Sequence, residues 1–471
     1  MRPFPAYAVV PPDVRAADRE RRLFRWLHPR LPPRVHDALA RALLILAALA
    51  ASLIALVEAS PARAGGFQLR TGSPDWSANA FAGMSAKAYD ASTAWTNPAG
   101  MTRISGNEVD LGINAVWTSI TFAGTDTIGG APVTGSQGGN AGGLSALPAL
   151  EAVFSVTPDL KLGLSVEEPF GLRTSWSGDF VGRYQALVSS ISDVEIGLVG
   201  AYRLTPTLSI GGGPIIDHLA ARLTTAINTG PLAAFGDPVA DVGGDSWAVG
   251  YHLGLLWEAT PALRFGLDYR SRIGEAISGN QTVTIPAMTG IVSPATAAAL
   301  GTLAHPVQAQ LALPDVLTLG GAWEITPRIT ALATLQWVHW SLLQALTLTN
   351  GASPSAVMVF HNRDAWMGSL GVNYTPAGAP RWRLQGGIGY ERGPIEPGSR
   401  TPRLPGQDVI MLGVGASYAI TPAIRVQAAY LHEFGLADGS NSYSATPSAG
   451  VLTGAYSVAA DVASLGVAWR F

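Results

Sequence analysis

Residues 257–270 read Trp-Glu-Ala-Thr-Pro-Ala-Leu-Arg-Phe-Gly-Leu-Asp-Tyr-Arg. The proline suits a tight turn, because its φ angle is fixed and it has no N–H to give to a β-ladder. After the turn, one face of an extended chain carries Phe265, Leu267 and Tyr269. The other face carries Arg264, Asp268 and Arg270. An apolar face opposite a polar face is typical of a strand that separates lipid from a polar lumen.

The same turn recurs along the chain. Thr-Pro pairs follow strand-like segments at six threonines, namely Thr157, Thr205, Thr260, Thr326, Thr375 and Thr421. Four of these threonines stand three places after an aromatic residue, which is Tyr202, Trp257, Trp323 or Tyr418. Tyr and Trp prefer the boundary between membrane and water. Each unit therefore predicts a strand that ends at an aromatic girdle, followed by a short periplasmic turn.

The other connections are long, irregular and rich in Gly, Ser and Pro, as in 123–146 and 226–246. Short turns on one side and long loops on the other are typical of outer-membrane barrels. Both termini of such a barrel lie in the periplasm, so six periplasmic turns separate seven hairpins. The sequence therefore predicts an all-β fold, a transmembrane antiparallel β-barrel of about 14 strands.

The composition supports this fold class. Charged residues make up 13% of the chain, whereas soluble domains carry about 25%. The longest apolar run, residues 42–57, is shorter than the ~20 residues that a spanning helix needs. A soluble all-β protein is the alternative. The chain has no cysteine, which excludes disulfides and Cys-based metal sites, and we expect no cofactor and no metal.

The N-terminal part has the features of a targeting segment. Residues 1–64 hold ten Arg and five acidic residues, and the apolar run within them is followed by Ala62-Arg63-Ala64. An apolar run before such an A-x-A site is typical of a cleaved signal peptide, so we expect residues 1–64 to be a leader and Gly65 to begin the mature chain. A retained membrane anchor is the alternative. The charge asymmetry gives no signal for nucleic-acid binding.

The C-terminal residues predict a last strand. Leu465, Val467, Trp469 and Phe471 fall on one face of an extended segment. Trp469 and the terminal Phe471 resemble the signal that the barrel-assembly machinery reads. That machinery and outer-membrane lipid are therefore the expected partners of a chain that we expect to be a monomer.

Three stretches resemble the FadL family of outer-membrane transporters for long-chain fatty acids and aromatic hydrocarbons. The first is Gly66-Phe67-Gln68-Leu69 at the mature start, and the second is Asn97-Pro98-Ala99-Gly100-Met101. The third is the later part of the chain, where short segments such as Leu313-Pro314-Asp315 match the family pattern. The resemblance covers residues 65–471. It implies a hatch over 65–105, containing the motif Asn97, Pro98, Ala99 and Gly100, inside a barrel over 106–471. The small residues before Asn97 agree with short helices packed in a lumen, which would block bulk water.

One predicted strand breaks its own pattern. The predicted lipid-facing side of this strand carries Leu162, Leu164 and Val166, and the residues between them face the lumen. If the alternation continued, Glu168 would also face lipid. Pro169 then removes a ladder donor, and Phe170 and Gly171 follow. We expect an inward kink over Glu168, Pro169, Phe170 and Gly171. The resemblance implies a lateral exit there, since this family kinks its third strand. A local bulge with no role in transport is the alternative.

Three charged residues are candidates for a polar site in the lumen: Arg222, Asp268 and Arg270. Asp268 and Arg270 form either a structural ion pair or an anchor for a substrate head group. In fatty-acid transporters of the family, basic residues can hold the carboxylate, but Thr224 and Thr347 stand near the corresponding places. This departure leaves neutral or aromatic substrates open.

The function expected from the sequence is outer-membrane transport of hydrophobic small molecules, long-chain fatty acids or aromatic hydrocarbons, in a Gram-negative cell. The protein is not expected to be an enzyme. The alternatives are a barrel enzyme of the lipase or protease type, and a structural or adhesive surface protein. An enzyme would need a Ser/His or acid pair at the rim. His218, His252, His339 and His432 show no convincing partner by spacing.

Overall fold

The computed structural model describes residues 68–230, 233, 236–285, 302–350, 353–396, 398–436, 441–446 and 448–471. These residues belong to one compact unit that spans Leu49–Phe471. The predicted leader, its cleavage residues Ala62 and Ala64, and Gly65 lie outside the described residues. No helix in the described part of the chain is long and apolar enough to cross a membrane.

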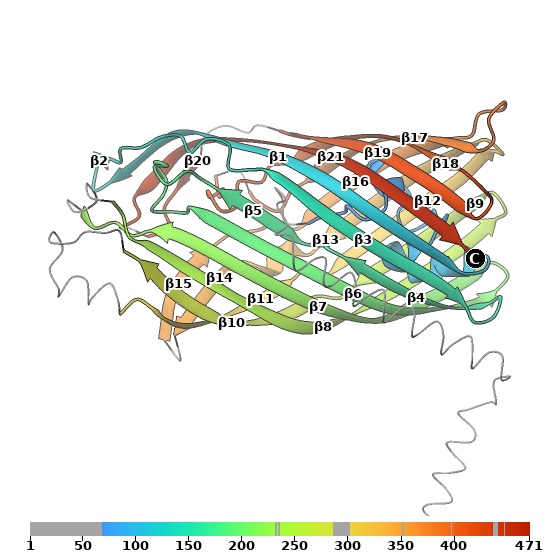
Figure 1. Ribbon diagram of the computed structural model, residues 1–471, viewed down its shortest axis with the longest axis horizontal. Coiled ribbons are helices and arrows are strands. Elements are labelled where there is room, and N and C mark those ends of the chain that lie inside the picture. The colour runs from blue at the N-terminus through green and yellow to red at the C-terminus, as the bar shows by residue number, and fades with distance from the viewer. Residues whose placement is uncertain are drawn as a thin grey trace, which may run out of the picture. The chain divides into compact units, whose positions relative to one another are not determined.

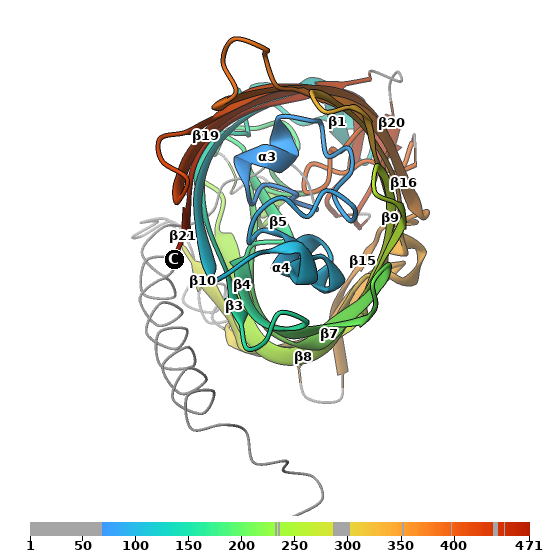
Figure 2. The same ribbon diagram turned by 90° about the vertical axis from the view of Figure 1, so that its right-hand side faces the viewer.

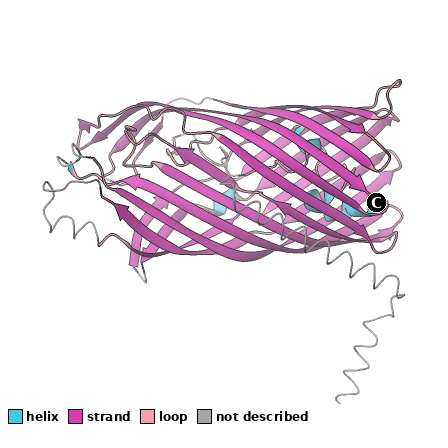
Figure 3. Ribbon diagram, in the orientation of Figure 1, coloured by secondary structure: helices cyan, strands magenta, loops and turns pink. Residues whose placement is uncertain are grey.

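Strands dominate the fold (Figures 1 and 3). They are β1(Glu108–Ile128), β2(Ala131–Pro132), β3(Leu144–Ser155), β4(Leu160–Glu167), β5(Gly171–Ser175), β6(Val188–Thr205), β7(Leu208–Ala226), β8(Val239–Thr260), β9(Leu263–Arg270), β10(Ile273–Thr284), β11(His305–Leu313), β12(Val316–Thr326), β13(Ile329–Val338), β14(Ala345–Asn350), β15(Ser353–Val359), β16(Ala365–Tyr374), β17(Trp382–Arg392), β18(Val409–Ala419), β19(Ile424–Gly435), β20(Asn441–Tyr443) and β21(Val451–Arg470). The helical elements are α3(Pro74–Ser77), α4(Thr93–Thr96), η1(Pro98–Arg103) and η3(Trp340–Leu342).

The sheet closes on itself into a barrel. β1 pairs with β21 in an antiparallel register that runs from Glu108 opposite Arg470 to Thr127 opposite Val451. Five wall positions are each occupied by two consecutive short strands, which are β4/β5, β9/β10, β11/β12, β13/β14 and β15/β16. β2 and β20 only extend the ladder beside β1 and β21. The wall thus has fourteen antiparallel positions, and the predicted strand number is confirmed.

All six Thr-Pro pairs lie in the turns between successive wall strands, as predicted. The structure also shows why threonine precedes the proline. In the turn from β8 to β9, the Thr260 hydroxyl accepts hydrogen bonds from the N–H groups of Ala262 and Leu263, at 3.2 and 3.0 Å. The Thr326 and Thr421 hydroxyls accept the equivalent pairs of bonds. The side chain therefore satisfies backbone donors that the turn leaves without a partner.

The predicted alternation is present in β9. Phe265 and Leu267 are exposed on the outer surface, whereas Arg264 and Asp268 are buried in the lumen. Trp257 and Trp323, which precede two of the turns, are about half exposed on the outside. The outer surface is thus apolar, with aromatic side chains near the turn end, as expected of a wall that faces lipid.

The N-terminal segment lies inside the barrel. Figure 2 shows α3 and α4 within the ring of strands. From Ser73 to Thr102 almost every side chain is buried, including the polar ones. The predicted hatch of short helices in the lumen is confirmed. Its polar groups therefore need partners from the hatch itself or from the wall.

Candidate functional site

The third wall position is interrupted where the sequence predicted a kink. β4 ends at Glu167 and β5 begins at Gly171, as the separate arrow in Figure 1 shows. β5 pairs with β6, and β3 pairs with β4 only from Leu150 onward. Between β5 and residues 144–149 of β3, both fully described, there is no strand pairing. The backbone ladder of the barrel is thus broken over about six residues.

A short piece of the N-terminal segment, residues 68–71, lies against the inner side of this break; we call it the N-terminal strap. Gln68 and Phe170 form an antiparallel bridge, and the Leu69 N–H donates to the Pro169 carbonyl at 2.8 Å. A Cβ on Gly171 would stand 2.7 Å from Leu69 Cδ1. The strap therefore takes part of the place that a continuous third strand would occupy.

A cavity of about 120 Å³ adjoins the strap. Its apolar lining includes Leu69, Phe81, Val116, Leu172, Trp340 and Leu404. The loop 393–408, between β17 and β18, contributes several further lining residues. Because Leu69 and Leu172 belong to the strap and to β5, the cavity reaches the interrupted part of the wall.

One buried cation of the strap lines this cavity. Arg70 Nε donates to Gln336 Oε1 at 2.8 Å, and one terminal nitrogen donates to Gln68 Oε1 at 2.7 Å. The other terminal nitrogen donates to Glu391 Oε2 at 2.6 Å, which makes a largely buried ion pair. Glu433 lines the same cavity from β19. Sequence reasoning missed these residues, because no spacing rule joins residue 70 to strands more than 250 residues later.

The motif residues Asn97, Pro98, Ala99 and Gly100 lie at the junction of α4 and η1 and are buried. Asn97 Oδ1 accepts from the Ala99 N–H, and Asn97 Nδ2 donates to the carbonyls of Ser85 and Leu255. Asn97 therefore bonds to the wall at β8 rather than at the kink. Pro169, at the kink, is instead bonded by Leu69.

Glycines of the wall make room for this motif. A Cβ on Gly254 of β8 would stand 2.1 Å from Asn97 Oδ1, and one on Gly211 of β7 would stand 2.6 Å from the Ala99 nitrogen. Gly211 and Gly254 are register partners, so together they form a groove in the inner wall. The abundance of glycine was visible in the sequence, but its placement at inward positions under the hatch was not inferred.

We expect Gly254→Val to loosen the hatch by about 1–3 kcal/mol, the usual cost of overpacking. The hatch should then become more sensitive to protease while the barrel stays heat-modifiable. The control is Gly386→Val, because a Cβ there meets nothing nearer than 3.8 Å. Equal protease sensitivity of the two variants would contradict the proposed fit between wall and hatch.

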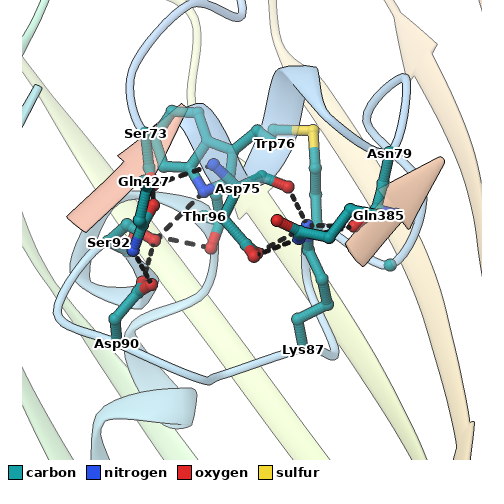
Figure 4. A network of polar contacts seen from close by, with 12 residues as sticks. Ser73, Asp75, Trp76, Asn79, Lys87, Asp90, Ser92, Thr96, Gln385 and Gln427 are labelled. Carbon is teal, nitrogen blue, oxygen red and sulfur yellow. Dashed lines mark hydrogen bonds and ion pairs between the residues drawn. The ribbon is translucent and has the colours of Figure 1, made fainter. Parts of the chain in front are cut away.

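A polar network holds the first half of the hatch to the wall (Figure 4). The Lys87 ammonium lies 2.8 Å from the Asp75 carboxylate, and both side chains are buried. Gln385 of β17 donates to Asp75 at 2.5 Å, and Gln427 of β19 donates to Asp90 at 3.1 Å. Burial alone would raise the pKa of Asp75, but the charges of Lys87 and Arg383, with hydrogen bonds from Lys87 and Gln385, lower that pKa below its usual value.

Of the predicted polar residues, Asp268 and Arg270 face the lumen and Arg222 does not. Arg222 is exposed on the outer face of β7, where it pairs with Asp241 at 2.6 Å. The prediction of a lumen role for Arg222 is therefore wrong, because its position has the outward parity of β7. Thr224 is buried and accepts from the Val188 N–H.

Asp268 and Arg270 do not pair with each other, which corrects the predicted ion pair. Asp268 contacts His252 at 2.5 Å, and Arg270 forms an ion pair with Glu195 of β6. Both residues line a small cavity of about 20 Å³ together with Pro169 and Phe170. The structure thus brings Asp268 and Arg270 beside the predicted kink, with partners from β8 and β6 rather than from β9 itself.

Each of the four histidines considered for catalysis lies beside an aspartate that spacing did not reveal. The pairs are His218–Asp245, His252–Asp268, His339–Asp315 and His432–Asp461. Within the described residues, no group of three or more His, Asp or Glu side chains is placed to hold a metal ion.

The last strand has the predicted pattern. Trp469 and Phe471 are about half exposed on the outside, with ring centroids 4.7 Å apart. The Phe471 N–H donates to the Asn107 carbonyl at 2.9 Å, beside the start of β1. The two aromatic rings thus lie at the seam where the barrel closes.

Comparison with known proteins agrees with this architecture. The long-chain fatty acid transport protein of Escherichia coli O6:H1 is 26% identical over 430 residues, covering 83% of this chain and 93% of that protein. Outer membrane protein P1 of Haemophilus influenzae is 25% identical over 420 residues, covering 80% and 87%.

Solved structures show the same fold. The crystal structure of a Pseudomonas aeruginosa FadL homologue superposes with a TM-score of 0.80 at 23% identity, covering 86% of this chain and 100% of that one. The Ralstonia pickettii toluene transporter TbuX gives a TM-score of 0.58 at 18% identity, covering 85% and 98%. Residues 55–471 match the family described as outer membrane protein transport protein (OMPP1/FadL/TodX). The chain therefore belongs to the OMPP1/FadL/TodX family of outer-membrane transport proteins.

Proposed function

We propose that this protein carries hydrophobic small molecules, long-chain fatty acids or aromatic hydrocarbons, across the outer membrane of a Gram-negative cell. The observation that carries the proposal is the position of a largely apolar cavity beside an interrupted wall, bordered by the hatch that is buried inside the barrel. A hatch inside the barrel opposes bulk diffusion of water and polar solutes through the lumen. A relative named for long-chain fatty acid transport and a structural neighbour named for toluene transport support the same class of cargo.

The proposed exit is sideways, through the kink at Glu168, Pro169, Phe170 and Gly171. A hydrophobic molecule released into periplasmic water exposes its surface, at about 0.8 kcal/mol per CH₂. Release between β3 and β5 into the bilayer avoids that cost. Leu69 lies between the cavity and the kink, so the strap has to shift for a molecule to pass.

The two alternative functions have less support. An enzyme of the lipase or protease type would need an activated nucleophile. Each candidate histidine lies beside an aspartate, but within the described residues no serine hydroxyl hydrogen-bonds to any of them. A structural or adhesive protein would need neither the cavity nor the broken ladder. We therefore propose a transporter without catalytic activity, cofactor or nucleic-acid partner. It would be a monomer embedded in outer-membrane lipid and assembled by the barrel-assembly machinery through Trp469 and Phe471.

Uptake in cells tests this function. Cells that lack their own transporter of this class, with and without this protein, are given labelled toluene and, separately, a labelled long-chain fatty acid. We expect the protein to raise the initial uptake rate of at least one of them severalfold. If neither compound enters faster, while the protein is present and heat-modifiable in the outer membrane, the transport proposal fails.

A further inference from the structure

We propose that Glu391 and Glu433 make the 120 Å³ cavity selective for uncharged hydrophobic molecules over carboxylates, by neutralising Arg70. This inference rests on the proposed transport function and narrows its substrate class. Arg70, Glu391 and Glu433 are the charged side chains among the described residues that line the cavity. One cationic side chain therefore faces two carboxyl groups.

The geometry of Arg70 leaves it poorly placed to receive a carboxylate ligand. Its three guanidinium nitrogens already donate to Gln336, Gln68 and Glu391, at 2.6–2.8 Å. To pair with the terminal nitrogen that Glu391 uses, a carboxylate ligand would have to displace Glu391. It would then leave that acidic side chain buried without its partner, which is costly in a desolvated site. An uncharged molecule can occupy the cavity with the ion pair intact.

Glu433 strengthens this exclusion. It reaches the cavity from β19, and β18 lies between it and Glu391 of β17. Both acidic side chains therefore face the space where a ligand would sit, from adjacent parts of the wall. A negatively charged ligand would meet repulsion from Glu391, and from Glu433 when that side chain is ionised, whereas an uncharged ligand would meet neither.

The size of the cavity favours a compact molecule. A cavity of roughly 150 Å³ lined by apolar side chains accommodates benzene, and the volume here is about 120 Å³. The apolar part of the lining, including Phe81 and Trp340, suits a single aromatic ring. The volume and the charges of the cavity point to the same class, a small uncharged hydrocarbon.

The test compares toluene with benzoate, which share a ring and differ by the carboxylate. Equilibrium dialysis with the purified full-length protein in detergent gives both affinities. We expect benzoate to bind at least about tenfold more weakly than toluene. In the double variant Glu391→Gln and Glu433→Gln, each amide keeps a hydrogen-bond acceptor and loses the charge. Benzoate affinity should then rise about tenfold or more, with toluene affinity within about twofold of the original.

Two further variants make the result specific. Adding Arg70→Gln to the double variant should remove the gain in benzoate affinity. Asp241→Asn, which neutralises a carboxylate on the outer face, should behave as the unmodified protein. The proposal is overturned if the unmodified protein binds benzoate as tightly as toluene, if it binds no toluene, if the double variant shows no gain, or if the triple variant retains it.

The same variants, assayed for toluene uptake in cells, separate the two proposals. If toluene uptake depends on the protein but benzoate affinity does not change when Glu391 and Glu433 are neutralised, only the selectivity inference fails. If the purified protein discriminates as expected but uptake does not depend on it, the transport function fails instead.

Discussion

Replacing Glu168 with Ser and Pro169 with Val should reduce uptake of hydrophobic compounds to the level of cells without the protein. The introduced valine supplies the N–H that Pro169 lacks, and the introduced serine removes the buried carboxyl group of Glu168, so the third strand can pair with β3 across the present break. A fall of tenfold corresponds to about 1.4 kcal/mol in the transport barrier, and one added hydrogen bond contributes that order of energy. The measurement is the initial rate of labelled toluene uptake.

A second variant tests the same break in another way. Gly171→Trp should also stop uptake, since even a Cβ there meets Leu69 at 2.7 Å. Gly274→Trp is the matched control, because a Cβ on Gly274 meets nothing within 4 Å. Both proteins should remain heat-modifiable. If the variant with Glu168→Ser and Pro169→Val takes up toluene at the normal rate, substrate leaves by another route, past the hatch.

Lys87→Met should destabilise the seated hatch by up to about 3–5 kcal/mol, because it leaves the buried Asp75 carboxylate without its nearer ion-pair partner. Arg383 stands 3.8 Å from Asp75, too far to replace the hydrogen bonds of Lys87. Outer-membrane permeability to a small polar antibiotic should rise, and residues 74–103 should lose protection from hydrogen exchange. The barrel should still assemble, since its ladder is unchanged.

The control for this prediction removes both charges. Lys87→Met combined with Asp75→Leu should recover most of the lost protection, because neither charge of the Lys87–Asp75 pair is then left buried alone. The pH dependence has a defined sign. Because the pKa of Asp75 is lowered in the folded protein, its stabilising contribution is complete above the usual value of 3.8 and is lost as the pH falls further. No recovery in the double variant would mean that the ion pair is not what seats the hatch.

Local rules predicted the wall of the barrel well. The Thr-Pro turns, the two-residue alternation and the broken parity at Glu168 are all short-range patterns, and each corresponds to a feature of the structure. The pairing of strands then follows from chain order, because each strand pairs with the strands to which its turns connect it. The number of strands could therefore be counted from the turns.

The interior could not be predicted in this way. The partners of Arg70, Asp268 and Arg270 come from other strands, and their approach depends on the stagger between strands. Arg222 was assigned to the wrong face because no turn or charge pattern fixed the parity of β7 at that end. The strap contact with Pro169 joins residues a hundred positions apart and has no local signature.

The most direct test of a lateral exit is photolabelling by a light-activated toluene analogue, with the protein reconstituted in outer-membrane lipid vesicles. The labelled residues are mapped by mass spectrometry. A lateral exit predicts labels in the cavity and on both sides of the broken ladder, at Leu147, Phe170 and Leu172. Labels near Arg103 and Glu258, at the periplasmic end of the hatch, with none between β3 and β5, would contradict it.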